Sequence, residues 1–73
     1  MPFMIVEVFK TNVNGTELAE TLIRQVLDHF PDSRVNFDLE DCDNILRVEA
    51  KTVIPEKIIE ILNLNGYSCK VLI

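Results

Sequence analysis

The chain has 73 residues, 48% of them hydrophobic, and a formal net charge of −5 from 12 acidic and 7 basic side chains. This length suits one small domain over residues 1–73, and the apolar content excludes a disordered chain. The acidic balance, with Lys and Arg dispersed along the sequence, disfavours nucleic-acid binding. The sequence contains no apolar run of the roughly 18 residues that cross a bilayer and no signal peptide, so we expect a cytoplasmic protein without a membrane partner.

A strand is predicted over residues 4–11, which are rich in Ile, Val and Phe. Glu7 interrupts the apolar run and is expected to face water. Because side chains alternate along a strand, this choice gives an outward pair and a core-facing pair, Ile5 with Phe9 and Val6 with Val8. Lys10 would then point inward unless the strand ends or bulges near Phe9.

An amphipathic helix is predicted over residues 16–30. Asn14 is the expected N-cap, with Glu17 three residues later as in a capping box, and Thr16 is the competing cap. The apolar stripe of this helix comprises Leu18, Ala19, Leu22, Ile23, Val26, Leu27 and Phe30. His29 lies in the last turn, where we expect a solvated side chain with no catalytic role.

Two alternating strands are predicted over residues 34–40 and 45–51, joined by an Asp- and Asn-rich hairpin turn at 41–44. Their core-facing side chains are expected to be Val35, Phe37, Leu39, Leu46, Val48 and Ala50. The outward side chains of the second of these strands are expected to be Ile45, Arg47 and Glu49.

A second helix is predicted to begin at Pro55 and to end near Leu64, with Gly66 as the residue that closes it. Its apolar stripe comprises Ile58, Ile59, Ile61 and Leu62. A last strand is predicted over 67–73, with three side chains inward, Cys69, Val71 and Ile73.

The order strand, helix, strand, strand, helix, strand predicts an α+β fold, the ferredoxin-like βαββαβ plait. In that fold a four-stranded antiparallel sheet with strand order 4-1-3-2 carries both helices on one face. The topology also brings three turns together at one end, at residues 12–15, 41–44 and 65–67. A ligand site would most naturally lie there.

The length, the element order and two segments resemble the heavy-metal-associated domain family, which includes copper chaperones and the soluble modules of metal-pumping ATPases. The segments are the hairpin at 37–48 and the ending at 64–71, with its Gly66-Tyr67 step. The resemblance implies a Met-x-Cys-x-x-Cys metal site after the first strand. With Val13 at the Met position, however, Gly15 and Leu18 occupy the two Cys positions. A soft metal ion needs thiolates, so the metal-binding role is not carried over.

The chain offers no other obvious chemistry. Cys42 and Cys69 are predicted to lie at opposite edges of the sheet, roughly 12 Å apart at the usual strand spacing, which is too far for a disulfide or a shared ion. Cys69 is expected in the core and Cys42 as an exposed thiol in an acidic turn. The acidic hairpin lacks the ligand spacing of a calcium loop, and no Ser/His/Asp or Cys/His arrangement is visible. We therefore assign no catalytic, cofactor-binding or metal residue.

The outward face of the sheet is the remaining candidate, because helices on one face leave the other open to a partner. The predicted interaction surface comprises Ile5, Phe9, Ile45, Arg47 and Leu72. The sequence thus predicts a non-enzymatic binding module that lacks its family's metal site and that binds itself as a homodimer or binds another protein. The alternatives are an atypical metal-trafficking protein and a small-ligand-sensing regulatory plait.

Overall fold

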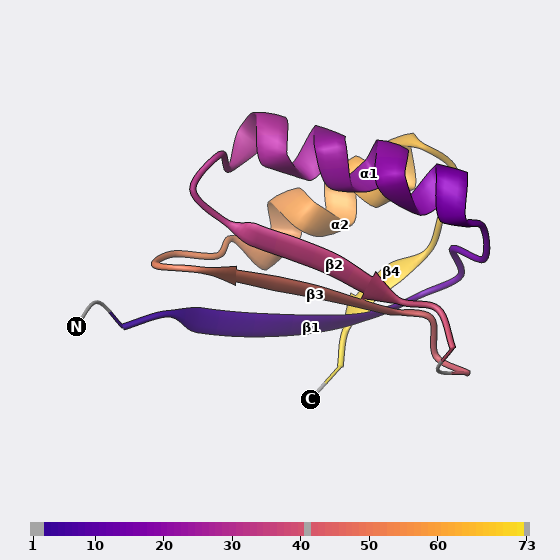
Figure 1. Ribbon diagram of the computed structural model, residues 1–73, viewed down its shortest axis with the longest axis horizontal. Helices are drawn as coiled ribbons and strands as arrows, with labels where there is room; N and C mark the ends of the chain where they lie inside the picture. Colours follow the sequence, from indigo (N-terminus) through magenta and orange to yellow (C-terminus); the bar gives the residue numbers. More distant parts are fainter. Residues whose placement is uncertain (1–2, 41, 73) are drawn as a thin grey trace.

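The computed structural model describes residues 3–40 and 42–72, which form four strands and two helices. Both helices lie on the same side of the sheet, and the opposite face is left uncovered (Figure 1). No helix in the described part of the chain is long and apolar enough to cross a membrane. In chain order the elements are β1 (Ile5–Thr11), α1 (Thr16–His29), β2 (Arg34–Asp38), β3 (Ile45–Ala50), α2 (Pro55–Leu64) and β4 (Cys69–Val71).

The sheet has the strand order β2-β3-β1-β4, and every neighbouring pair is antiparallel. Counted from the other edge, the same neighbours read 4-1-3-2. The predicted α+β class, with two helices and a four-stranded antiparallel sheet, is confirmed. β1 lies between β3 and β4, and its register therefore decides which side chains reach the core and which face solvent.

The predicted facing of β1 is wrong. Phe9 is fully buried, with 0% exposure, in the cluster between the sheet and the helices. Its register partners are Leu46 on β3 and Val71 on β4, which also belong to the core or pack against it. Lys10 is exposed and Thr11 is buried, so the odd-numbered residues of this strand face the helices and the even-numbered ones face outward.

The orientation of β1 depends on two charged residues, Glu7 at an odd-numbered position and Lys10 at an even-numbered one. Because side chains alternate along a regular strand, the two cannot both face water. Burying the large Phe9 side chain is worth about 2–3 kcal/mol, and this places Glu7 on the helix side. Glu7 is only half-buried, but its Oε2 atom is buried without a hydrogen-bond partner among the described residues. Glu7 therefore occupies the core-side position at a cost to the folded state.

α1 begins one residue later than a cap at Asn14 would require. Its N-cap is Gly15, and no side chain caps the helix, so the predicted caps Asn14 and Thr16 are both wrong. The buried face comprises Ala19, Leu22 and Val26. Leu18, predicted within the stripe, is 45% exposed because it lies at the edge of that face.

The alternation of β2 and β3 is confirmed. Val35, Phe37 and Leu39 pack against the core, and Leu46, Val48 and Ala50 are buried. Ile45 is the exception among the outward residues, because it is 5% exposed although its register position is on the open side. It pairs with Lys10 on one side and Asp38 on the other.

The second half of the chain follows the prediction closely. α2 spans Pro55–Leu64 and buries Ile58, Ile61 and Leu62. Gly66 has a φ of +89°, the left-handed conformation that glycine adopts without steric cost, and it reverses the chain after the helix. β4 is shorter than predicted, and Cys69 and Val71 pack against the core as expected. The predicted inward position of Ile73 lies outside the described residues.

Candidate functional site

The uncovered face of the sheet, here called the open face, can be reconstructed from the strand register. Three rows of cross-strand neighbours run over it. From β2 toward β4 the rows are Arg34–Glu49–Val6, then Asn36–Arg47–Val8–Leu72, then Asp38–Ile45–Lys10–Lys70. Since strand side chains alternate, all of these residues project away from the helices.

An apolar patch lies on the β1–β4 side of the open face. It consists of Val6, Val8 and Leu72. Val6 is 47% exposed, Leu72 is 39% exposed, and Val8 between them is partly buried. The Leu72 backbone N–H donates to the Val8 carbonyl oxygen at 2.8 Å, which fixes these two residues side by side. The patch is thus a contiguous apolar surface held by the backbone of two strands.

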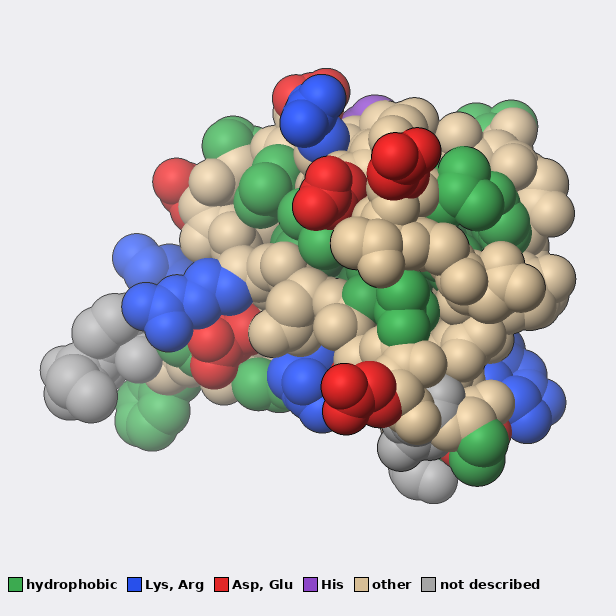
Figure 2. Space-filling model, turned by 45° about the vertical axis from the view of Figure 1, so that its right-hand side comes forward, with side chains coloured by type: hydrophobic (Ala, Val, Ile, Leu, Met, Phe, Trp, Pro, Cys, Tyr) green, Lys and Arg blue, Asp and Glu red, His purple; other side chains and the backbone are tan. Residues whose placement is uncertain are grey.

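Charged side chains surround the apolar patch, and they are predominantly basic. Among the described residues, the three rows of the open face carry four basic side chains, Arg34, Arg47, Lys10 and Lys70, and two acidic ones, Glu49 and Asp38. The strand pairing therefore brings four of the seven basic residues, which are dispersed in the sequence, to one face of the sheet. In Figure 2 basic side chains lie mainly along the lower, sheet half of the molecule, whereas acidic ones occur in both halves. A chain with a net charge of −5 thus presents a locally positive face.

Two ion pairs touch this face, and both are solvated. The Arg34 guanidinium lies 4.0 Å from a Glu49 carboxylate oxygen, and the Lys10 ammonium lies 3.5 Å from Asp43 Oδ1. Exposed pairs of this kind contribute about 0–1 kcal/mol each. Among the described residues, Arg47 and Lys70 form no ion pair and remain available to a ligand.

The predicted interaction surface is only partly retained by this geometry. Phe9 lies in the core, and Ile45 is buried, so neither side chain can contact a partner. Ile5 is 48% exposed but lies on the helix side of the strand by register. Arg47 and Leu72 are exposed on the open face as predicted.

Sequence reasoning missed Val6 and Val8. The signal that could have found them was Lys10, which shares their parity and marks the solvent side of β1. Glu7 in the middle of β1 and Lys10 near its end predict opposite orientations of the strand. The burial of Phe9 shows that Lys10 marks the solvent side.

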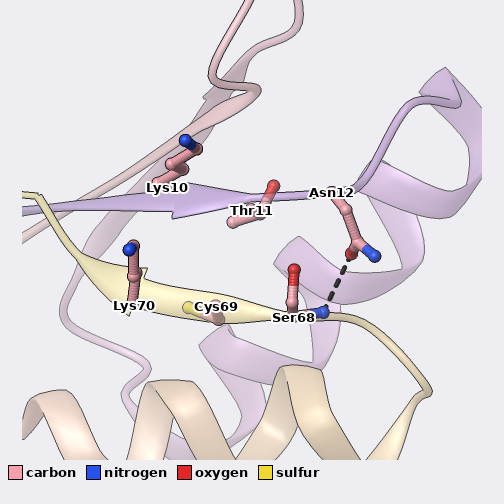
Figure 3. Close-up of a pocket in the computed structure, with 6 residues that line it drawn as sticks. All are labelled: Lys10, Thr11, Asn12, Ser68, Cys69 and Lys70. Carbon is pink, nitrogen blue, oxygen red and sulfur yellow. Dashed lines mark hydrogen bonds between the residues drawn. The ribbon is translucent and has the colours of Figure 1, made fainter.

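Three turns were predicted to lie at one end of the sheet. There, residues at the end of β1 are hydrogen-bonded to the hairpin turn and to the segment that precedes β4. The Thr11 backbone N–H donates to the Asp43 carbonyl oxygen at 3.2 Å, and its hydroxyl donates to the Asn44 carbonyl oxygen at 2.6 Å. On the other side, the Ser68 N–H donates to Asn12 Oδ1 at 2.9 Å (Figure 3). A hollow of about 380 Å³ lies where β1 and β4 separate.

The two cysteines are free thiols in different surroundings. Cys42 is exposed, as predicted, and Cys69 is partly buried against the core. Burial raises the pKa of the Cys69 thiol from 9.0 to about 12, so it is neutral at physiological pH and is a poor nucleophile or metal ligand. Among residues 3–40 and 42–72, no group of three or more His, Cys, Asp and Glu side chains could hold a metal ion.

Comparison with known proteins adds no assignment. No protein-family model matches the chain, and no curated protein matches it.

Proposed function

We propose that this chain is a non-enzymatic protein-interaction module that binds an acidic, apolar segment of another protein on the open face of its sheet. The observation that carries the proposal is the apolar patch of Val6, Val8 and Leu72 on a sheet face that neither helix covers. Exposed apolar side chains that adjoin one another are typical of contact surfaces.

Charge complementarity selects the kind of partner. The apolar patch is bordered by Arg47, Lys10 and Lys70. Carboxylates on a partner would pair with these side chains while the apolar residues of that partner cover the patch. Two open faces packed against each other would bring like charges together, so a homodimer through this face is the less favoured arrangement.

We extend the proposal to the fold type and the family of the chain. The element order and the shared helix face suit a ferredoxin-like plait, and the hairpin and the Gly66-Tyr67 ending resemble the heavy-metal-associated domain. The proposed module would be a relative of that family without its metal site, since Gly15 and Leu18 stand at the thiolate positions. Two free thiols suit a reducing compartment, and we therefore place the module in the cytoplasm.

Peptide selection tests the proposal without knowledge of the partner. A random displayed peptide library is selected on the wild-type protein, and the enriched peptides are then measured against the double variant Val6→Thr/Val8→Thr. Threonine keeps the β-branched shape but removes apolar surface from the patch. Leu64→Gln is the matched control, because Leu64 is 80% exposed at the end of α2 on the other layer.

We expect enriched peptides to combine apolar residues with Asp or Glu and to bind the double variant at least about tenfold more weakly. Binding to Leu64→Gln should be unchanged. Peptides that bind the double variant as tightly as the wild type would overturn the proposal. Sedimentation equilibrium is the companion measurement: a dimer that the double variant dissociates would assign the patch to a second copy instead.

The small-ligand alternative is favoured by one specific observation, the hollow of about 380 Å³ between the ends of β1 and β4. Binding pockets for small molecules commonly have volumes of about 300–1,000 Å³.

A further inference from the structure

The hollow at the end of β1 has a lining suited to an anion. Six of the described residues line it, and none of these six is acidic: Lys10, Thr11, Asn12, Ser68, Cys69 and Lys70. Lys10 and Lys70 are direct register partners on β1 and β4. Asn12, which follows β1, and Ser68, which precedes β4, lie beyond this lysine pair, where the two strands separate. The hollow therefore opens beside the basic end of the open face.

Hydrogen-bond donors on both strands remain available around the hollow. The Asn12 carboxamide oxygen accepts from the Ser68 N–H, and the Asn12 Nδ2 group has no partner among residues 3–40 and 42–72. Within the described residues the Ser68 hydroxyl has no hydrogen-bond partner, and Lys70 has no ion pair. Figure 3 shows the Lys70 and Ser68 side chains pointing from β4 toward β1, whereas Lys10 points away from β4.

Lys10 and Lys70 occupy paired positions on neighbouring strands, although the Lys10 side chain points away from β4. Like charges directly opposite each other on neighbouring strands destabilise a sheet. Lys10 is partly compensated by Asp43 at 3.5 Å, but both side chains of that pair are well exposed to solvent. An anion bound in the hollow, with Lys10 turned toward it, would attract both ammonium groups and offset the repulsion between them.

We propose that the hollow binds the phosphate group of a small phosphate monoester. A phosphate carries nearly two negative charges at neutral pH, which matches two ammonium groups, and its oxygens accept several hydrogen bonds at once. Lys70, Ser68 Oγ and Asn12 Nδ2 supply the donors, and Lys10 joins them by exchanging Asp43 for the phosphate. The volume of about 380 Å³ leaves room for the organic part of the ester. This site shares Lys10 and Lys70 with the border of the apolar patch but none of the three apolar residues, and it specifies the small-ligand alternative rather than the docking proposal.

The test is a chemical-shift titration of the labelled protein with glycerol 3-phosphate, inorganic phosphate and acetate at constant ionic strength. We expect saturable shifts at residues 10–12 and 68–70 with a Kd below about 1 mM for the phosphate compounds, and none for acetate. Equal affinity for the ester and for inorganic phosphate would assign the site to the free anion. No saturable shift with either phosphate compound would overturn the proposal.

Variants distinguish a built site from general attraction to positive charge. Lys70→Gln should weaken binding roughly tenfold or more, and Lys70→Arg should largely restore it. Lys51→Gln is the charge-matched control, because Lys51 follows β3 at the opposite end of the sheet. Asp43→Asn should tighten binding by releasing Lys10. Equal losses in Lys70→Gln and Lys51→Gln would contradict the site, and the spectra themselves report whether each variant is folded.

Discussion

The replacement Phe9→Ala tests the register of the central strand, on which the assignment of the open face depends. Phe9 is fully buried between Leu46 and Val71. Truncating a buried Phe to Ala costs about 3–5 kcal/mol, from lost transfer free energy and from the cavity left behind. A chain of 73 residues has a total stability of about 4–11 kcal/mol, so this single change removes a large part of it. The neighbouring change Val8→Ala, on the open face, should cost about 1 kcal/mol or less.

Urea unfolding followed by circular dichroism measures both changes. With a slope of about 1 kcal/mol per M, Phe9→Ala should lower the midpoint by about 3–5 M or should leave the chain unfolded without denaturant. Phe9→Leu keeps most of the apolar volume and gives a measurable intermediate loss if the alanine variant does not fold. A loss of about 1 kcal/mol or less for Phe9→Ala, together with a larger one for Val8→Ala, would refute the register and restore the outward facing of Phe9.

Three further changes have defined outcomes. Glu7→Leu should raise the free energy of unfolding by about 1 kcal/mol, because it replaces a carboxylate whose Oε2 is buried without a partner; a loss of stability in urea would contradict the burial of that atom. Gly66→Ala should cost about 1–2 kcal/mol at a φ of +89°, whereas Gly66→Asn should cost less, and equal costs in thermal unfolding would argue against a left-handed residue there. The Cys69 thiol contributes stability that is fully present below pH 9.0 and is lost toward pH 12, because the unfolded thiol ionises first. Between neutral pH and about pH 10 the wild type should therefore lose about 1 kcal/mol more than Cys69→Ala, after allowance for solvent screening, and identical pH profiles would disprove the shift.

Much of the fold could be predicted because hydrophobic periodicity is unambiguous where charged residues occupy one face only. Val35 and Phe37 on β2, and Leu46 and Val48 on β3, alternate with polar residues and were placed correctly. The α2 helix was also placed correctly, since Pro55 marks its start. These signals are local, and packing does not overrule them.

The register of β1 could not be settled in the same way. Glu7 and Lys10 have opposite parity, so one of them must lie on the helix side, and the sequence pattern does not say which one. The answer depends on what faces each position across the sheet. Phe9 meets Leu46 and Val71 there, and this tertiary environment outweighs the cost of placing Glu7 inward.

The candidate sites were hidden for a related reason. Lys10 and Lys70 lie near opposite ends of the sequence, and only the pairing of β1 with β4 makes them neighbours. Val8 and Leu72 meet through the same pairing. Composition therefore described an acidic chain with dispersed basic residues, although the strand order brings four of the seven to one face.

Amide chemical-shift changes on adding a selected acidic, apolar peptide test most directly whether the open face is the surface that binds a partner. We expect the largest changes at Val6, Val8 and Leu72 and at the neighbouring Arg47, with α1 and α2 nearly unaffected. Changes centred on the helices, with the β1–β4 patch unperturbed, would contradict this role of the open face.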